Sequence, residues 1–410
     1  MKRILIFALS VLLILGALGS CSQNKADKTA DISLQTKETD DQADEPLDAV
    51  ACSVASIVAP SDKTDSEALA ILAAVNDYTT QKSLTYAEIS ATKDTPASCL
   101  SAIKRAVDGG AQIIVLPSCR SGEAVGKASV NFPDVRFIAV YNTHADIPDV
   151  GFTIKKNTAL VGISGETGGY LAGYAAVYEQ KYNLSVLAGE ASESSLSYAL
   201  GFIQGAEAAA EKLSLPDSSV SVTLCYSGSG ESDNGKSAEL FSGSDILPGS
   251  DLIFACGKAL TEAAYDAAAS GKLVIGTDGD YSACSSAMLT FIKTDVVPAF
   301  ADILSKTDSN SDWVNYCGKQ NNYSVLPDKS AAIGLADSFD RFTAFNETEY
   351  ASALAQAQNL SVSGVTLSSP SGYPEVSDIT SVLSLPKINL MITAPQTVAV
   401  DGGTADNAEE

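Results

Sequence analysis

Short runs of apolar, often β-branched residues alternate along most of the chain with longer segments whose apolar residues recur at helical spacing. The expected strands are Cys52–Ala59, Leu84–Ala91, Gln112–Leu116, Arg136–Tyr141, Leu184–Ala188, Val220–Tyr226, Leu252–Cys256, Lys272–Gly276 and Met288–Lys293. The expected helices include Ser66–Lys82, Gly165–Gln180, Ser197–Leu213, Thr261–Ser270 and Val296–Lys306. Strands separated by helices of this length predict βαβ units and parallel sheets. Because so many strands exceed one ordinary domain, the pattern predicts an α/β protein with two doubly wound lobes and an interlobe ligand cleft.

The two ends of the chain follow a different pattern. Lys2 and Arg3 precede an apolar run that ends at Leu18-Gly19-Ser20-Cys21, a sequence that resembles the bacterial lipobox. The run is too short for a comfortable transmembrane helix, so residues 1–20 are predicted to be a signal peptide and Cys21 to carry the lipid anchor. The alternative is an ordinary signal peptide with an incidental cysteine. Residues 21–50 read as the lipidated cysteine followed by a flexible linker, and residues 369–410 as a partly disordered C-terminal extension.

Charge and cysteine usage narrow the class of partner. The chain has 410 residues and a formal net charge of -24, so it would repel nucleic acid and anionic lipid. Any attachment to a membrane must then be hydrophobic or covalent. Seven cysteines besides Cys21 form no CxxC pair and no zinc-ligand spacing, which predicts buried reduced thiols and no metal or other cofactor.

Five short motifs then point to a family. They are Phe132–Phe137, Gly165–Ala176, Ala199–Ala206, Val274–Asp280 and Met288–Lys293. Their order and spacing resemble the basic membrane protein family, the nucleoside-binding lipoproteins of ABC importers with a type I periplasmic-binding-protein fold. The resemblance covers roughly residues 51 to 368 and implies a substrate-binding protein without enzymatic activity. Its implied partners are a nucleoside-like small molecule and ABC permease subunits, and its implied place is the extracytoplasmic face of the cell membrane.

The resemblance also implies how the chain is divided. Residues 51–150 and 278–315 are expected to form lobe 1, and residues 151–277 and 316–368 lobe 2. The resemblance implies a hinge as well, at which the chain crosses between lobes near residues 143–157, 277–284 and 310–325.

The strongest site candidates lie where expected strands end. Asp278 follows an apolar strand, and its carboxylate is a good acceptor for a vicinal diol. Lys293 ends the next strand, and Gly257 allows close approach of the backbone to a ligand. The other candidate ligand-binding residues are Asp62, Asp65, Ser118, Asn142, Gly168, Gly169, Tyr170 and Tyr281. The family's stacking aromatic and asparagine in the first loop are replaced here by Asp65 and Ser66, so Tyr170, Tyr281 or Tyr226 would have to stack on the ligand instead.

Three other functions compete with import. A ligand-sensing surface lipoprotein without a transporter would have the same sequence features. Gly230–Ser237 matches the Walker A pattern of a P-loop NTPase, but Glu231 and Asp233 place negative charge where phosphates would bind. Nucleophilic catalysis with a histidine base would need His144, the only histidine, which lies in an expected crossover.

Overall fold

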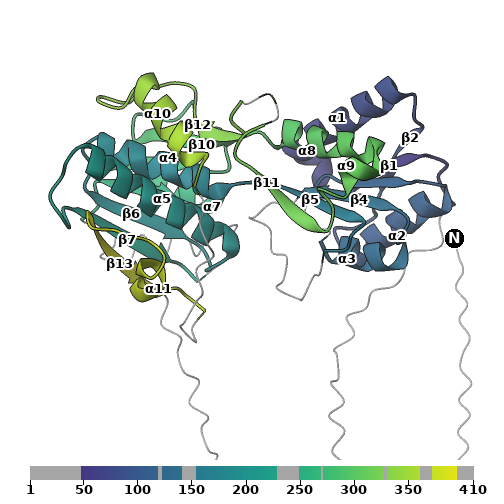
Figure 1. Ribbon diagram of the computed structural model, residues 1–410, viewed down its shortest axis with the longest axis horizontal. Helices are drawn as coiled ribbons and strands as arrows, with labels where there is room; N and C mark the ends of the chain where they lie inside the picture. The colour runs from purple at the N-terminus through teal and green to yellow at the C-terminus, as the bar shows by residue number, and fades with distance from the viewer. Residues whose placement is uncertain are drawn as a thin grey trace, which may run out of the picture. The chain divides into compact units, whose positions relative to one another are not determined.

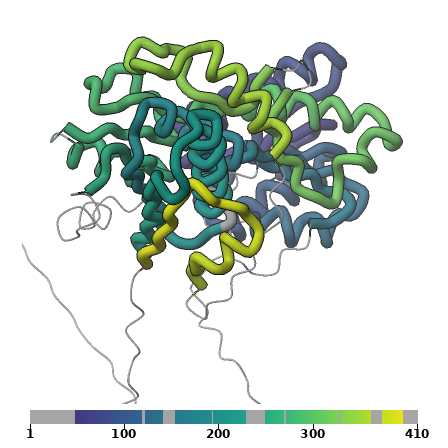
Figure 2. The backbone as a smooth tube through the Cα atoms, turned by 60° about the vertical axis from the view of Figure 1, so that its left-hand side comes forward, coloured from purple at the N-terminus to yellow at the C-terminus, as the bar shows by residue number. Residues whose placement is uncertain are grey.

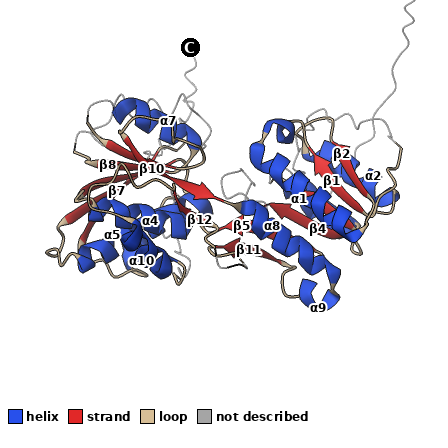
Figure 3. Cartoon of the chain, turned by 90° about the horizontal axis from the view of Figure 1, so that it is seen from above, coloured by secondary structure: helices blue, strands red, loops and turns tan. Residues whose placement is uncertain are grey.

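A computed structural model describes residues 48–118, 122–140, 154–228, 249–268, 271–326, 328, 330–360 and 372–394. The described chain forms two sheets, each with helices on both faces, and each sheet with its helices is called a lobe below (Figure 3). The predicted signal peptide, the lipidation site Cys21 and most of the predicted linker lie outside the described residues, as does Asp401–Glu410. No helix among the described residues is long and apolar enough to cross a membrane.

Lobe 1 is built on a parallel sheet with the strand order β11-β5-β4-β3-β1-β2 (Figure 1). Its strands are β1 (Val54–Val58), β2 (Tyr86–Ser90), β3 (Ile113–Leu116), β4 (Arg136–Val140), β5 (Thr158–Ile163) and β11 (Lys319–Tyr323). One face packs on α1 (Ser66–Lys82) and α8 (Val296–Ser305), and the other on α2 (Pro96–Asp108) and α3 (Gly122–Asn131). The central strands β1, β3, β4 and β5 are buried along nearly their whole length, so their side chains supply a core to both faces. The short helices α9 (Asn310–Trp313), η1 (Ser61–Thr64) and η4 (Lys306–Asp308) complete the lobe.

Lobe 2 has the strand order β12-β10-β9-β8-β6-β7-β13, and only β12 runs antiparallel to its neighbour within this described sheet. Its strands are β6 (Asn183–Ala188), β7 (Val220–Tyr226), β8 (Leu252–Ala255), β9 (Leu273–Gly276), β10 (Met288–Thr294), β12 (Ile333–Leu335) and β13 (Ile388–Thr393). The larger core lies under α4 (Gly165–Tyr178), α5 (Glu193–Lys212) and α10 (Glu347–Ala357). The opposite face packs on α7 (Lys258–Ala267).

The predicted α/β class with parallel sheets is confirmed, but the predicted lobe boundaries are wrong at three strands. β5 and β11 pair with each other in lobe 1, although their residues were assigned to lobe 2. β10 pairs with β9 in lobe 2, although it was assigned to lobe 1. An apolar run shows that a strand exists, whereas its hydrogen-bonded neighbours decide which sheet it joins.

The crossovers therefore lie elsewhere than predicted. The chain passes between sheets at Ser164, at Thr294–Asp295 and between β11 and β12, rather than near 143–157 or 277–284. These passages are hydrogen-bonded to one another, because Ser164 N donates to Tyr323 O at 3.0 Å and Asp295 N donates to Ala332 O at 2.9 Å. The third passage lies between the end of β11 at Tyr323 and the start of β12 at Ile333, so it begins at the end of the predicted 310–325 segment.

Residues 372–394 of the predicted C-terminal extension are an ordered part of lobe 2. Residues 372–394 form α11 (Val376–Thr380) and β13, which pairs in parallel with β7 from Ile388 to Thr393. Figure 2 traces this yellow segment along the teal part of the lobe. β13 was not among the strands predicted from the sequence, although its apolar residues alternate with polar or exposed ones as in a strand.

The cysteines are mostly buried, as predicted. The side chains of Cys52, Cys99, Cys225 and Cys256 are buried, while Cys284 and Cys317 are only partly covered. Burial raises the pKa of Cys225 to about 11, so this thiol stays protonated and unreactive at neutral pH.

Candidate ligand-binding site

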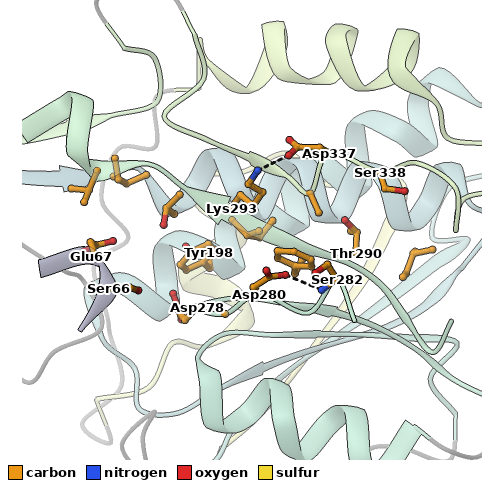
Figure 4. Close-up of a pocket in the computed structure, with 18 of the residues that line it drawn as sticks. Ser66, Glu67, Tyr198, Asp278, Asp280, Ser282, Thr290, Lys293, Asp337 and Ser338 are labelled. Carbon is orange, nitrogen blue, oxygen red and sulfur yellow. Dashed lines mark hydrogen bonds and ion pairs between the residues drawn. The ribbon is translucent and has the colours of Figure 1, made fainter. Parts of the chain in front are cut away.

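A pocket of about 960 Å³ opens where β9 and β10 end (Figure 4). Its wall includes the turn after β9, residues 289–294 of β10 and the loop after β12. The start of α1 and the ends of β4 and β5 also contribute, at Asp65–Glu67, Val140 and Ile163, as do Tyr198 of α5 and Val296 of α8. Polar residues that follow parallel strands thus meet at one edge of the sheet, which is the usual ligand position in doubly wound folds.

Asp278 occupies the turn directly after β9. Its backbone has φ 58°, in the left-handed region that aspartate tolerates better than most residues. The buried hydroxyl of Thr277 lies 3.0 Å from Asp278 Oδ2 and donates to it. The turn thereby presents a positioned carboxylate to the pocket.

Lys293 lies near the end of β10, the strand next to β9, and forms an ion pair with Asp337, with 2.6 Å between Nζ and Oδ2. The side chains are 50% and 87% exposed, so solvent screens the pair and a ligand can replace it at small cost. Asp280 accepts a hydrogen bond from Ser282 N at 2.9 Å. The backbone and side chain of Ser282, followed by the charge of Lys293, hold the pKa of Asp280 below its ordinary value.

The charge of the pocket is strongly negative. Six carboxylates line it, namely those of Asp65, Glu67, Asp278, Asp280, Asp337 and Asp340. Lys293 and Arg341 are the basic residues of the described lining. The guanidinium of Arg341 donates to the carbonyls of Met288, Ser282 and Cys284 at 2.7 to 2.9 Å. Arg341 therefore braces the loop between β9 and β10 as well as facing the pocket.

The buried part of the lining is apolar. Tyr198 is 2% exposed and packs edge-on against Phe254, with ring centroids 6.0 Å apart. Leu289, Phe291 and Ile292 of β10 are also buried and line the same pocket. Buried rings and aliphatic side chains beside exposed carboxylates suit a ligand that has one less polar and one polar end.

Three of the predicted site residues meet in this pocket. Asp278 and Lys293 do so at the ends of their strands, and Asp65 at the start of α1. Asp65 is also the N-cap of α1, because its carboxylate accepts hydrogen bonds from Glu67 N at 2.9 Å and Ala68 N at 3.2 Å.

The predicted glycines and Tyr170 serve packing instead. A Cβ on Gly169 would lie 2.1 Å from Tyr198 O, and one on Gly168 would lie 2.7 Å from Ile333 Cδ1. Both residues lie within α4 and allow it to approach its neighbours closely. Tyr170 is 3% exposed and donates to Gln356 Oε1 at 3.0 Å. None of these three residues lines the pocket, and the contacts of this helix-opening signature are those of helix packing.

The remaining candidates within the described residues also lie outside the pocket lining. Gly257, at φ 113°, donates its N–H to Thr277 Oγ1 at 2.7 Å, and Asp62 accepts from Ala59 N at 2.7 Å. Tyr281 packs edge-on against Phe291, and its hydroxyl donates to Thr277 O. Two further candidates, Tyr226 and Ser118, do not line the pocket, and Tyr226 instead packs against Tyr373. The candidates Asn142 and His144 and the segment Gly230–Ser237 lie outside the described residues.

Several lining residues were missed from the sequence. They include Glu67, Tyr198, Asp280, Ser282, Thr290, Asp337, Asp340 and Arg341. Asp280 and Ser282 share a turn with Asp278, so the same strand-end argument could have found them. The loop after β12 had no comparable signal, because β12 has only three residues.

Comparison with known proteins identifies the family. The sequence model of the "ABC transporter substrate-binding protein PnrA-like" (Bmp) family matches residues 62–313, which is more than half of the chain. The chain belongs to this family. The predicted resemblance is confirmed, and the general class of function with it: these are extracytoplasmic substrate-binding proteins of ABC transporters rather than a class of enzymes.

Solved structures agree on the fold. A transcriptional activator of the comK gene from Bacillus halodurans matches with a TM-score of 0.53 at 17% identity, over 74% of this chain and 95% of that chain. AraP, an arabinose-binding protein from Geobacillus stearothermophilus, matches with a TM-score of 0.51 at 12% identity, over 73% and 100%. At such identities the likeness concerns the fold alone. A search of curated proteins finds no match.

Proposed function

We propose that this chain is the lipid-anchored binding component of an ABC importer, and that its pocket takes a neutral polar ligand, a nucleoside first of all. The placement of Asp278 and Lys293 beside the buried ring of Tyr198 carries the proposal. A carboxylate and an ammonium are suited to sugar hydroxyls, and a buried aromatic wall is suited to a base.

The excess of carboxylates argues against phosphorylated ligands. A nucleotide would bring its phosphate near six carboxylates, while one of the two basic groups is held by backbone carbonyls. Like charges at close range in a partly desolvated pocket are costly. We therefore expect nucleosides to bind and their monophosphates to be rejected.

A sensor without a transporter would bind the same ligand, so binding alone does not separate the two roles. Import predicts a complex with permease subunits that forms when the ligand is bound, because closure around a ligand creates the surface that a permease recognises. Co-purification with the permease in the presence of ligand favours import. If cells that lack the gene for this protein take up the ligand as fast as wild-type cells do, the sensor role is favoured.

The first experiment measures unfolding temperature of the full chain in detergent. The panel contains adenosine, guanosine, inosine and uridine, their monophosphates, arabinose and amino acids. A ligand at 100 times Kd adds about 2.7 kcal/mol to the unfolding free energy, which shifts the midpoint by a few degrees.

Asp278→Asn is the matched variant for this experiment. Losing a hydrogen bond to a charged acceptor costs about 1.5–3 kcal/mol, so we expect Kd to rise by roughly 10- to 100-fold. Asp108→Asn is the control, since Asp108 pairs with Lys104 on the exposed side of α2 away from the pocket. Binding of a nucleoside with equal affinity by wild type and Asp278→Asn would remove Asp278 from the site.

A further inference from the structure

Thr290 lies in the buried wall of the pocket, in the middle of β10. The residue is 2% exposed, and it lines the pocket together with its chain neighbours Leu289 and Phe291. The strand has an irregular register here, since Met288 pairs with Val274 and Thr290 with the next residue, Ile275. Figure 4 shows the Thr290 hydroxyl among the lining side chains (Figure 4).

The hydroxyl of Thr290 has no hydrogen-bond partner within the described part of the chain. Burying a hydroxyl without a partner is unfavourable, and most such groups in folded proteins are satisfied. Valine has nearly the same shape and would fill this position without that cost. A threonine in the wall of a binding pocket is explained when the partner of its hydroxyl is a molecule in the pocket.

We propose that Thr290 Oγ1 makes a buried hydrogen bond to the ligand and is a specificity-determining residue of this site. This inference rests on the proposed binding function. A hydroxyl can donate and accept, so it matches a carbonyl, a ring nitrogen, an amide or a hydroxyl group of an uncharged ligand.

The surroundings of Thr290 indicate which end of the ligand it contacts. The neighbouring Tyr198, Leu289 and Phe291 are buried, whereas Asp278, Asp280 and Asp337 are exposed. The less polar end of the ligand then packs on the buried residues, with one polar atom at Thr290. The hydroxyl-rich end meets the exposed carboxylates and Lys293. A site built around one buried hydrogen bond strongly rejects analogues that lack the matching group.

The test compares Thr290→Val with Thr290→Ser and with a matched control, Thr158→Val. Thr158 lies in β5, is fully buried, and its hydroxyl likewise lacks a partner among the described residues, but it does not line the pocket. All variants are made in the full chain in detergent. Unfolding temperature is measured without ligand, and Kd by calorimetry with whichever of adenosine, guanosine, inosine or uridine raises the wild-type midpoint most.

We expect opposite effects on stability and affinity. Thr290→Val should unfold at the same temperature as wild type or higher, and should bind the nucleoside about tenfold more weakly. Thr290→Ser should keep the affinity within about threefold, because it keeps the hydroxyl. Thr158→Val should leave Kd unchanged while its stability behaves like that of Thr290→Val.

Two results overturn the inference. One is a Thr290→Val protein that binds as tightly as wild type. The other is a Thr290→Val protein that unfolds at lower temperature than both wild type and Thr158→Val, which would mean that the hydroxyl is satisfied within the protein. If no nucleoside raises the wild-type midpoint, the proposed nucleoside function is contradicted. The unfolding temperatures without ligand still decide whether the Thr290 hydroxyl has a partner within the protein.

Discussion

Glu179 shows how a buried carboxylate can stabilise this fold. It is 5% exposed and lies at the C-terminal end of α4. Its two oxygens accept hydrogen bonds from the amides of Thr343, Ala344 and Phe345 and from the Thr343 hydroxyl, at 2.6 to 3.0 Å. Burial alone would raise the pKa of Glu179, but these hydrogen bonds outweigh it and hold the pKa below its ordinary value. The carboxylate thereby fixes the loop that precedes α10.

Glu179→Gln should lower the free energy of unfolding by about 2 kcal/mol at neutral pH, because an amide replaces a charged acceptor of several donors. The folded-state pKa lies below the unfolded value near 4.5, so this stabilisation is complete above that value and is lost as pH falls through the folded-state pKa. Urea unfolding from pH 7 to pH 3 should show the difference from wild type shrinking below about pH 4.5.

The exposed ion pair on α2 provides the control for this prediction. Asp108→Asn breaks its contact with Lys104 and should change stability by less than about 0.5 kcal/mol at any of these pH values. A Glu179→Gln protein that is as stable as Asp108→Asn at pH 7 would contradict the role of this carboxylate.

At the level of single residues, the sequence predicted only part of the site. Asp278 and Lys293 were found because they end apolar strands, and strand ends of parallel sheets gather at one edge. Thr290 was missed because a threonine within an apolar run has high β-propensity and reads as ordinary strand. The residues Asp337 to Arg341 were missed because their position depends on a three-residue antiparallel strand, β12, which no periodicity marks.

Helices α4 and α5 are in contact through glycines. A Cβ on Gly173 would lie 2.0 Å from Phe202 O, and one on Gly205 would lie 1.9 Å from Tyr170 O. Gly201 approaches Glu166 O in the same way, at 2.1 Å. Glycines on both helices therefore let the two backbones touch, in an arrangement that also places Tyr198 of α5 at the pocket. In this chain, the glycines of the stretches Gly165–Ala176 and Ala199–Ala206 thus serve this helix contact.

Gly173→Ala separates two opposing effects. Helix propensity alone predicts that alanine stabilises α4 by about 1 kcal/mol. The contact with the Phe202 carbonyl predicts the opposite, because backbone cannot move aside as a flexible side chain can. We expect a net loss of about 2 kcal/mol or more, measured as a lower urea midpoint.

Gly249→Ala is the control for the helix contact, since its Cβ would meet no described atom within 4 Å. This variant should leave the midpoint nearly unchanged. If Gly173→Ala were as stable as wild type, α4 and α5 could not be packed as closely as described.

For the whole molecule, the alternation of strands and helices was enough to predict two parallel α/β lobes. It was not enough to divide the chain between them. β5 and β10 lie immediately before the passages at Ser164 and Thr294–Asp295, so each belongs to the sheet that the chain is about to leave. That choice depends on pairing between strands far apart in sequence, such as β5 with β11, which no local pattern encodes.

The C-terminal segment provides a test of what the second lobe requires. Ile379 and Ile388 are buried in the core under α4 and α5, and β13 covers the edge of β7. Lys387 N also donates to both carboxylate oxygens of Glu207, at 3.1 and 3.0 Å. Burial raises the pKa of Glu207, so loss of this amide would leave a costly buried acid.

Deleting residues 372–410 should therefore lower the unfolding free energy by about 4 kcal/mol or more, because two core isoleucines are lost. It should also promote association, because the bare edge of β7 becomes a template for strand pairing. Deleting only residues 395–410 keeps β13 and its contacts, and is the control. Urea unfolding measures the first effect and light scattering the second. If the longer deletion unfolded at the same urea concentration as the shorter one and remained monomeric, β13 would contribute nothing to the lobe, and residues 369–410 would be the dispensable extension that their composition suggested.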